Sequence, residues 1–273
     1  MKTYFNTKTF DALAAQAGLE VTADPADATL LVLGAKKVDY SQFKILRSVY
    51  RFGVGTENID FELLKKRSIT VTFPSEREKK ILYDSTANFT VYGILTLLFS
   101  NAFGNADTWE KAQRDYIGGR VALVVGTGNI GKRVAAKLTP FVKVETYDVL
   151  TNKPHELEPF MRRADIITVH MPLDARTKNF FDREKLAWIK DGAIIVNTAR
   201  GALFDEDALY DKLRATTCRA FFDVFWEEPY NGKLKGLGSD KFFMTPHSAS
   251  NTKDFINESF KDILTIAKGL KNA

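Results

Sequence analysis

The most constraining feature of the sequence is an apolar run at residues 121–125 that leads directly into Gly126-Thr127-Gly128-Asn129-Ile130-Gly131. The apolar run predicts a buried strand, and the residues that follow, 130–138, predict a helix. A strand, a glycine turn and a helix in immediate succession are typical of a doubly wound parallel sheet. The sequence therefore predicts an α/β fold.

The same alternation of short apolar runs and amphipathic segments continues through almost the whole chain. Further strands are predicted at residues 29–33, 69–72, 142–147, 166–169, 193–197, 220–224 and 242–244. Helices are predicted at residues 61–66, 85–99, 183–189, 205–214 and 251–268. A chain of 273 residues suits two domains of about 100 to 150 residues each. Small and polar residues at 100–106 predict the first domain boundary, and the last helix could pack on either domain.

Composition excludes some classes of function. The net charge is +5, but the Lys and Arg residues are scattered among Asp and Glu, so we expect no nucleic-acid partner. A mildly basic surface also suits a small acidic substrate. The single cysteine, Cys218, permits no intramolecular disulfide and no multi-cysteine metal site, and we expect no metal. The start of the chain lacks a signal-peptide pattern, and no apolar stretch is long enough to span a bilayer, so we expect no membrane partner and a cytoplasmic location.

The glycine loop predicts a dinucleotide site. The first glycine permits a tight turn, the second lets the backbone approach a pyrophosphate, and the third allows close packing of helix on strand. Asp148 follows the next predicted strand, where a carboxylate can accept hydrogen bonds from the ribose of NAD and repel the extra phosphate of NADP. Two alternatives remain: a turn that only connects strand to helix, and another nucleotide-containing ligand such as S-adenosylmethionine.

Three histidines are available for acid–base chemistry. His155 follows a Lys-Pro turn and suits an exposed loop. His170 follows a strand, where it could simply line a cofactor cleft. His247 also follows a strand, and its approach is fixed by Pro246.

Reduction of a 2-oxo acid by hydride transfer needs a proton donor, a cation for the carboxylate and a group that keeps the donor charged. Arg200, Glu228 and His247 supply these three chemistries, and each follows the end of a predicted strand. Taken singly, Arg200 could form an ordinary salt bridge, Glu228 could be a solvated acid and His247 could be a loop histidine. Their shared placement favours one catalytic cleft.

With these motifs in order, the chain resembles the D-isomer-specific 2-hydroxyacid dehydrogenase family over nearly its whole length. The matching pieces are Gly53-Val54-Gly55-Thr56-Glu57-Asn58-Ile59-Asp60, the Gly126–Gly131 loop, His170-Met171-Pro172-Leu173 with Thr177, Asn197-Thr198-Ala199-Arg200-Gly201, Asp223-Val224-Phe225 with Glu228-Pro229, and Thr245-Pro246-His247.

The resemblance implies that Arg200 binds the substrate carboxylate, that His247 is the general acid and base, and that Glu228 pairs with His247. It also implies that Thr177 reaches a phosphate and that Asp223 and the Thr198 region meet the nicotinamide. The cofactor site is then expected at Gly126, Thr127, Gly128, Asn129, Ile130, Gly131, Asp148, His170, Met171, Pro172, Thr177, Thr198, Ala199, Arg200, Asp223 and His247. The substrate site is expected at Gly34, Ala35, Lys36, Val54, Gly55, Arg200 and His247, with backbone N–H groups around Val54 and Gly55 holding the substrate.

The resemblance further implies two Rossmann-like or flavodoxin-like domains. The substrate domain comprises residues 1–100 and the returning segment 251–273, and the NAD-binding domain comprises residues 101–250. A two-domain design is itself expected to close over its cleft, with hinges near Asn101 and Ser250. A homodimer through the NAD-binding domain is implied as well.

Several positions depart from the family pattern, among them Ser250 in place of a common glycine and the segment Gly34-Ala35-Lys36-Lys37, which lacks an arginine. Candidate substrates are therefore several: glyoxylate or hydroxypyruvate, D-lactate or pyruvate, and a 3-phosphoglycerate type. Gln usually stands at the Glu228 position in formate dehydrogenases of the family, which disfavours that activity. The alternative function is a non-catalytic NAD(H)-sensing protein on the same fold.

Overall fold

The computed structural model describes residues 1–100, 107–113 and 115–272. The chain divides into two compact units, the first made of Met1–Leu82 with Asn251–Ala273 and the second of Tyr83–Ser250. The first boundary lies at Leu82, inside a long helix, and not near residue 100 as the sequence suggested. The expected hinge at Asn101 lies outside the described residues, whereas Ser250 is the last residue of the second unit.

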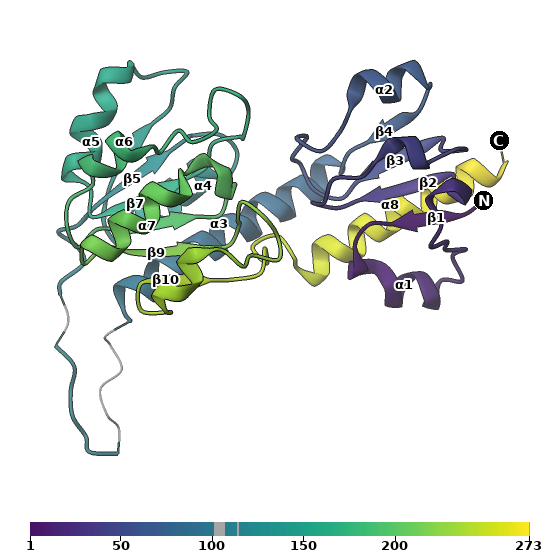
Figure 1. Ribbon diagram of the computed structural model, residues 1–273. Helices are drawn as coiled ribbons and strands as arrows, with labels where there is room; N and C mark the ends of the chain where they lie inside the picture. Colours follow the sequence, from purple (N-terminus) through teal and green to yellow (C-terminus); the bar gives the residue numbers. More distant parts are fainter. Residues whose placement is uncertain (101–106, 114, 273) are drawn as a thin grey trace. The chain divides into compact units, whose positions relative to one another are not determined.

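The first unit is built on a parallel four-stranded sheet in the order β1-β2-β3-β4 (Figure 1). Its strands are β1 (Thr3–Phe5), β2 (Leu30–Leu33), β3 (Ser48–Arg51) and β4 (Thr70–Thr72). Thr3 also forms a parallel bridge with Val21, on the side of β1 away from β2. Counting Val21 as a one-residue strand gives the order 2-1-3-4-5 of a flavodoxin-like sheet.

Helices cover both faces of this sheet. Helix α2 (Phe61–Lys66) packs on the face that carries Leu31, Leu33 and Val49. Helices α1 (Asp11–Gln16) and α8 (Lys253–Asn272) pack on the other face, which carries Leu30, Val32 and Tyr50. The buried stripe of α8 consists of Phe255, Ser259, Phe260, Ile263 and Ala267, which recur at the spacing of one helix face.

The second unit is built on a parallel six-stranded sheet in the order β10-β9-β8-β7-β5-β6 (Figure 1). Its strands are β5 (Val121–Val125), β6 (Lys143–Tyr147), β7 (Ile166–Val169), β8 (Ile194–Asn197), β9 (Arg219–Phe222) and β10 (Phe242–Met244). The chain runs outward from β5 to β6 and then crosses back to β7. The direction of winding therefore reverses between β5 and β7, which is the point where open parallel sheets bind ligands.

This sheet also has a helical layer on each face. One face packs against α5 (Leu157–Arg163), α6 (Arg183–Trp188) and α7 (Glu206–Ala215). The other packs against α3 (Glu76–Leu98) and α4 (Gly131–Leu138). Strands β7 and β8 are buried along their whole length, which explains their nearly continuous apolar sequence. The predicted α/β class with parallel, doubly wound sheets is confirmed.

The structure adds elements that the sequence did not indicate, namely β1, β3, α1 and α5, and it moves the start of α3. Strand β1 has three residues, too few to display a periodic pattern. Strand β3 ends on a charged residue, Arg51, that the fold buries. Helix α3 starts at Glu76 and not at residue 85, because a polar first stretch, Glu76 to Lys80, hides its beginning.

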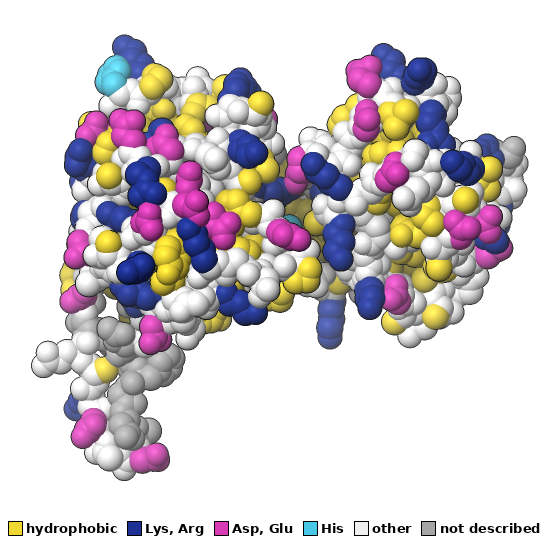
Figure 2. Space-filling view, viewed as in Figure 1, with side chains coloured by type: hydrophobic (Ala, Val, Ile, Leu, Met, Phe, Trp, Pro, Cys, Tyr) yellow, Lys and Arg dark blue, Asp and Glu magenta, His cyan; other side chains and the backbone are white. Residues whose placement is uncertain are grey.

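On the face shown in Figure 2, Lys and Arg side chains alternate with Asp and Glu side chains on each unit. Within the described part of the chain, no helix combines the length and the apolar character needed to cross a bilayer.

Candidate active site

The glycine loop follows β5 and opens α4, with the close packing that its glycines predict. Gly126 has a φ of 92°, a conformation that side-chain-bearing residues rarely adopt. A Cβ on Gly131 would collide with the carbonyl oxygen of Gly126, whereas a Cβ on Gly128 would meet nothing within 4 Å. The backbone at Gly128 is therefore open to a ligand.

The N–H groups of Gly128, Asn129 and Ile130 find no acceptor within the described residues, although Asn129 accepts a hydrogen bond from Arg133 at 2.6 Å through its carbonyl. Unpaired N–H groups at the start of a helix are a ready-made binding place for phosphate oxygens. The loop thus fits a pyrophosphate.

Asp148 follows β6 and lies beside the glycine loop. Its Oδ2 accepts hydrogen bonds from the N–H (2.7 Å) and the hydroxyl (3.0 Å) of Thr127, and its Oδ1 accepts one from the N–H of Leu150 (3.0 Å). Burial works to raise the pKa of Asp148, but these three donors outweigh it and hold the pKa below its usual value. A charged carboxylate with acceptor capacity left on Oδ1 suits ribose hydroxyls and opposes a phosphate.

His170 follows β7, on the other side of the winding reversal. Its Nε2 lies 3.0 Å from the hydroxyl of Thr168, and its backbone packs against Gly126. Burial lowers the pKa of His170 to about 3, so the ring is neutral near pH 7. A neutral ring cannot serve as the charged proton donor. Met171 is buried beside it, and Pro172 is exposed.

Thr177 is occupied within its own loop. Its hydroxyl donates to the Pro172 carbonyl at 2.7 Å and accepts from the Asp174 N–H at 2.8 Å. The side chain is buried, with 8% of its surface exposed. It therefore shapes the loop after β7, the element that would face a cofactor.

Thr198 and Ala199 lie at the end of β8. The hydroxyl of Thr198 lies 2.7 Å from that of Thr90 in α3, and the N–H of Ala199 donates to the side chain of Asn197 at 2.9 Å. These bonds fix the backbone immediately before Arg200. Arg200 is half-buried, and its Nη1 donates to the Ala199 carbonyl at 2.6 Å.

Asp223 follows β9 and is fully buried. Its carboxylate accepts hydrogen bonds from the Thr245 hydroxyl (2.6 Å) and from the N–H groups of Ser248 (2.7 Å) and Ala249 (2.9 Å). Burial raises the pKa of Asp223 in spite of these donors. The sequence assigned Asp223 to the nicotinamide, and the structure adds that its carboxylate anchors the segment containing His247.

His247 and Glu228 are in direct contact. His247 Nδ1 lies 2.9 Å from Glu228 Oε2 and 3.1 Å from Oε1, and both side chains are about one-third exposed, at 32% and 30%. Burial works to raise the pKa of Glu228, but the hydrogen bond and charge of His247, the N–H of Phe225 and the charge of Arg200 hold it below its usual value. The structure thus brings two of the three candidate catalytic residues into direct contact, and the third, Arg200, belongs to the same unit and acts on Glu228 through its charge.

The predicted substrate residues of the first unit occupy two loops. Gly34, Ala35 and Lys36 follow β2, and Val54 and Gly55 follow β3. Among the described residues, the N–H groups of Ala35, Lys36, Val54 and Gly55 have no acceptor. Three side chains that were not among the predicted site residues form hydrogen bonds with the backbone of these loops, namely Asn6, Arg51 and Asn58. The sequence carried no signal for Arg51, because β3, the strand that it ends, was not predicted.

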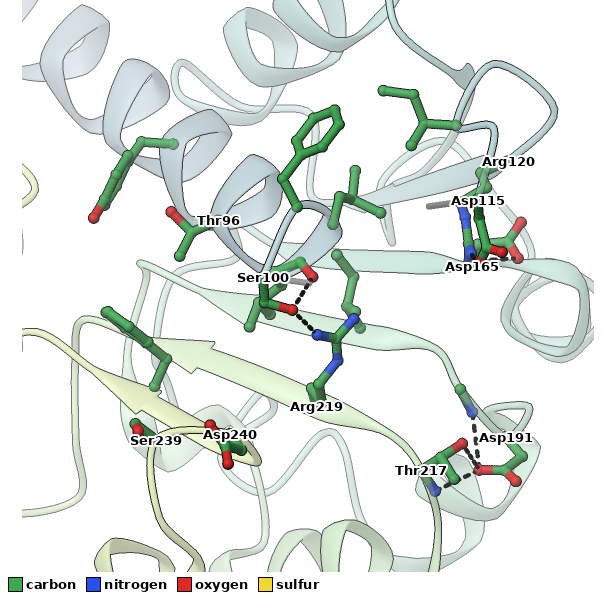
Figure 3. A pocket seen from close by; sticks show the side chains of 18 of the residues that line it. Thr96, Ser100, Asp115, Arg120, Asp165, Asp191, Thr217, Arg219, Ser239 and Asp240 are labelled. Atoms are coloured by element: carbon green, nitrogen blue, oxygen red, sulfur yellow. Dashed lines mark hydrogen bonds and ion pairs between the residues drawn. The ribbon is translucent and has the colours of Figure 1, made fainter. Parts of the chain in front are cut away.

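A hollow of about 1130 Å³ opens elsewhere in the second unit (Figure 3). Asp165, Asp191 and Arg219 lie at the beginnings of strands β7, β8 and β9, and they line it together with Ser100 at the end of α3. Arg219 donates to the Ser100 hydroxyl, and Thr217 donates to Asp191. This hollow lies at the opposite edge of the sheet from the glycine loop and from His247. Among the described residues, no group of His, Cys, Asp or Glu side chains is arranged to hold a metal.

Comparisons with known proteins identify the family. The profile of "D-isomer specific 2-hydroxyacid dehydrogenase, NAD binding domain" matches residues 98–249, more than half of the chain. The hydroxypyruvate reductase of Thermotoga maritima is 30% identical over 257 residues, covering 89% of this chain and 79% of that protein. The D-3-phosphoglycerate dehydrogenase of Methanocaldococcus jannaschii is 30% identical over 90% of this chain, which spans only 47% of that protein.

Among solved structures, the D-lactate dehydrogenase of Aquifex aeolicus, complexed with NAD and lactic acid, is similar to this chain. The match covers 100% of this chain and 96% of that one. Its TM-score is 0.79 and its sequence identity 22%, which supports the shared fold. Glycine loop, sheet topology and family profile agree, and the chain belongs to the D-isomer specific 2-hydroxyacid dehydrogenase family.

Proposed function

We propose that the protein reduces a small 2-oxo acid to its D-2-hydroxy acid with NADH, and catalyses the reverse oxidation with NAD. The family is one of NAD-dependent oxidoreductases, and NAD is the cofactor that the matched domain binds. The observation that carries the proposal is the contact between His247 and Glu228 beyond the strands of a sheet that also bears the glycine loop. When bound, the cofactor supplies or accepts the hydride. The chain supplies the proton donor and the groups that bind the substrate.

His247 is proposed as the general acid in reduction and the general base in oxidation. Because Nδ1 lies against Glu228, Nε2 remains to donate a proton to the developing alkoxide. The lowered pKa of Glu228 keeps this carboxylate negative near neutral pH, where it accepts a hydrogen bond from Nδ1 and fixes the orientation of the ring. The anchor from Asp223 holds the histidine segment in place.

Arg200 is proposed to bind the substrate carboxylate, since a guanidinium forms two parallel hydrogen bonds with a carboxylate. The N–H groups of Val54 and Gly55 are proposed to hold the substrate as well, which their lack of acceptors among the described residues supports. Gly34, Ala35 and Lys36 are proposed to contact the remainder of the substrate.

The substrate itself is proposed as glyoxylate or hydroxypyruvate, with pyruvate and a 3-phosphoglycerate type as further candidates. The names of the two relatives cited above, a hydroxypyruvate reductase and a D-3-phosphoglycerate dehydrogenase, cover two of these classes. Both are enzymes, which favours catalysis over the alternative of a non-catalytic NAD(H) sensor.

The function is tested by following NADH absorbance with a panel of these 2-oxo acids. Rapid oxidation of NADH with at least one of them is expected. Tight NADH binding without turnover of any acid would favour the sensor.

The assignment of His247 is tested by His247→Ala, for which kcat should fall by about 10²- to 10⁴-fold, the usual contribution of general acid–base catalysis. His155→Ala is the matched control, because this histidine is exposed on the same unit and should be dispensable. Equal turnover by the two variants would remove His247 from the mechanism.

We also propose a homodimer formed through the NAD-binding unit. The support is the exposure of three large aromatic side chains on that unit, with Tyr92 50%, Trp109 82% and Tyr116 86% exposed. Light scattering of the purified protein should give twice the mass of one chain, and Trp109→Glu with Tyr116→Glu should reduce it to one. A cytoplasmic location is proposed from the sequence, and fractionation of cells would test it.

A further inference from the structure

Arg51 ends β3 and is buried, with 3% of its surface exposed. Its Nη1 donates to the carbonyls of Leu33 (3.0 Å), Gly34 (2.6 Å) and Phe52 (3.1 Å), and its Nε donates to the carbonyl of Gly55 (2.6 Å). One guanidinium therefore ties the loop after β2 to the loop after β3.

Asn58 also forms hydrogen bonds with the loop after β2. It is 7% exposed, and its Nδ2 donates to the carbonyls of Gly34 (2.8 Å), Ala35 (3.2 Å) and Lys36 (3.1 Å). A flipped amide would set its oxygen against three carbonyl oxygens, so the hydrogen bonds fix the orientation. The Oδ1 of Asn58 is buried and has no partner among the described residues.

These bonds determine where the backbone N–H groups of the loops point. In a trans peptide the C=O and the following N–H point in opposite directions. Drawing the carbonyls of residues 34–36 toward Asn58 and Arg51 therefore turns the N–H groups of Ala35, Lys36 and Lys37 away from these side chains. The same geometry turns the N–H groups of Gly53 and Thr56 away from Arg51. None of these five N–H groups has an acceptor among the described residues.

The position in the sheet gives an independent argument. Counting the Val21 bridge, the winding of the first unit reverses between β1 and β2. Asn6 follows β1 there, and its side chain accepts from the N–H of Gly34 and donates to the carbonyl of Lys36 at 2.8 Å. The held loop thus lies at the place where a parallel sheet binds ligands.

We propose that Arg51 and Asn58 are positioning residues for the substrate, which aim the backbone N–H groups of residues 35–37, Gly53 and Thr56 at its anionic groups. The proposal rests on the proposed function, because it takes these loops as substrate-binding. Neither side chain is itself a catalytic residue. They act through the backbone that they hold.

Arg67 provides a matched control within the same unit. It also donates from its guanidinium to two backbone carbonyls, those of Tyr40 (2.8 Å) and Phe43, but it holds a segment outside both loops. Arg51→Lys, Arg67→Lys and Asn58→Ala should therefore be compared with the wild type. Lysine keeps the charge at either position but cannot reproduce the planar fork.

For Arg51→Lys and Asn58→Ala we expect the KM for the 2-oxo acid to rise by about 10- to 100-fold, the loss that a misplacement near 1 Å produces. The Kd for NADH should stay within about twofold, since the glycine loop belongs to the other unit. Arg67→Lys should change the melting temperature without changing KM. Arg51→Met, which loses every donor, should raise KM further than Arg51→Lys.

Calorimetric binding of oxamate, an unreactive mimic of a 2-oxo acid, to the NADH complex separates this proposal from the proposed function. Oxamate binding that weakens in the Arg51 and Asn58 variants supports the positioning role even if the wild type turns over no acid. Equal KM and equal oxamate Kd in the Arg51→Lys and Arg67→Lys variants would overturn it. So would a wild-type protein that binds no oxamate.

Discussion

The two units share one strand order around the point where the winding of the sheet reverses. The loops at this point are shaped by glycines in the second unit and by buried side chains in the first. In the second unit the loop depends on three glycines, which let the backbone of residues 126–131 approach itself closely and leave Gly128 open. In the first unit side chains are present and buried, and Arg51 and Asn58 hold the loops by their carbonyls. Parallel topology therefore provides a place for a ligand, and local chemistry decides which ligand.

The largest effect is expected when one methyl group is added to the glycine loop of the second unit. In Gly131→Ala the new Cβ meets the Gly126 backbone, which cannot move aside, and we expect a loss of stability of about 3 kcal/mol, the upper range for overpacking. Thermal unfolding and NADH titration measure it. Gly128→Ala is the control: its Cβ meets no protein atom, so it should fold normally and weaken only NADH binding. Equal stability of the two variants would refute the packing argument.

Cofactor choice should depend on the second unit alone. In Asp148→Ser the ratio of kcat/KM for NADPH to that for NADH should rise by about 10- to 100-fold, because about 1–3 kcal/mol of repulsion toward a 2′-phosphate disappears. Arg51→Lys, in the first unit, should leave this ratio as it is. Equal use of NADPH by the wild type would contradict the role given to Asp148.

The first unit should have a pH response of its own. Glu78 is buried on α3 and accepts from the Tyr50 hydroxyl and from the N–H of Ser75, each at 2.6 Å. Burial, followed by the hydrogen bond and charge of Glu78, raises the pKa of Asp262 on α8 to about 6. Burial works to raise the pKa of Glu78, but its hydrogen bonds with Asp262, Tyr50 and Ser75 lower it.

Because the pKa of Asp262 is raised on folding, its contribution to stability is complete below its unfolded value and disappears as pH rises through about 6. Asp262 is partly exposed, so we expect about 1 kcal/mol after solvent screening. Thermal unfolding at pH 5 and pH 7 measures the loss, and Asp262→Asn, which stays neutral at both, should reduce it. An identical pH dependence in the wild type and in Asp262→Asn would contradict the raised pKa of Asp262.

The sequence predicted the second unit far better than the first. Four of its strands, β5, β7, β8 and β9, are mostly apolar and buried, and parallel strands buried on both faces leave that signal in a sequence. His247, Glu228 and Arg200 could be selected as candidates because each follows the end of a predicted strand. In the first unit β1 is too short to show a pattern, and β3 has only four residues and ends on the charged Arg51.

The hydrogen bonds by which Arg51 and Asn58 hold the loops after β2 and β3 could not be derived from the sequence, for a physical reason. Arg51 and Asn58 contact backbone carbonyls, and every residue carries a carbonyl, so no complementary residue type marks their partners. Burial of a charged side chain is set by the tertiary fold. The same holds for Asp223, whose partners include two N–H groups of residues 248–249.

His247 has a φ of 52°, in the left-handed region where a residue with a Cβ is disfavoured by about 1–2 kcal/mol. Glycine would adopt this backbone conformation at no such cost. A glycine at this position would therefore favour the stability of the fold, but it would remove the imidazole. The hydrogen bonds from Ser248 and Ala249 to the buried Asp223 offset the difference. Part of the folding free energy of this unit thus holds His247, the residue proposed to move a proton, in a strained backbone conformation.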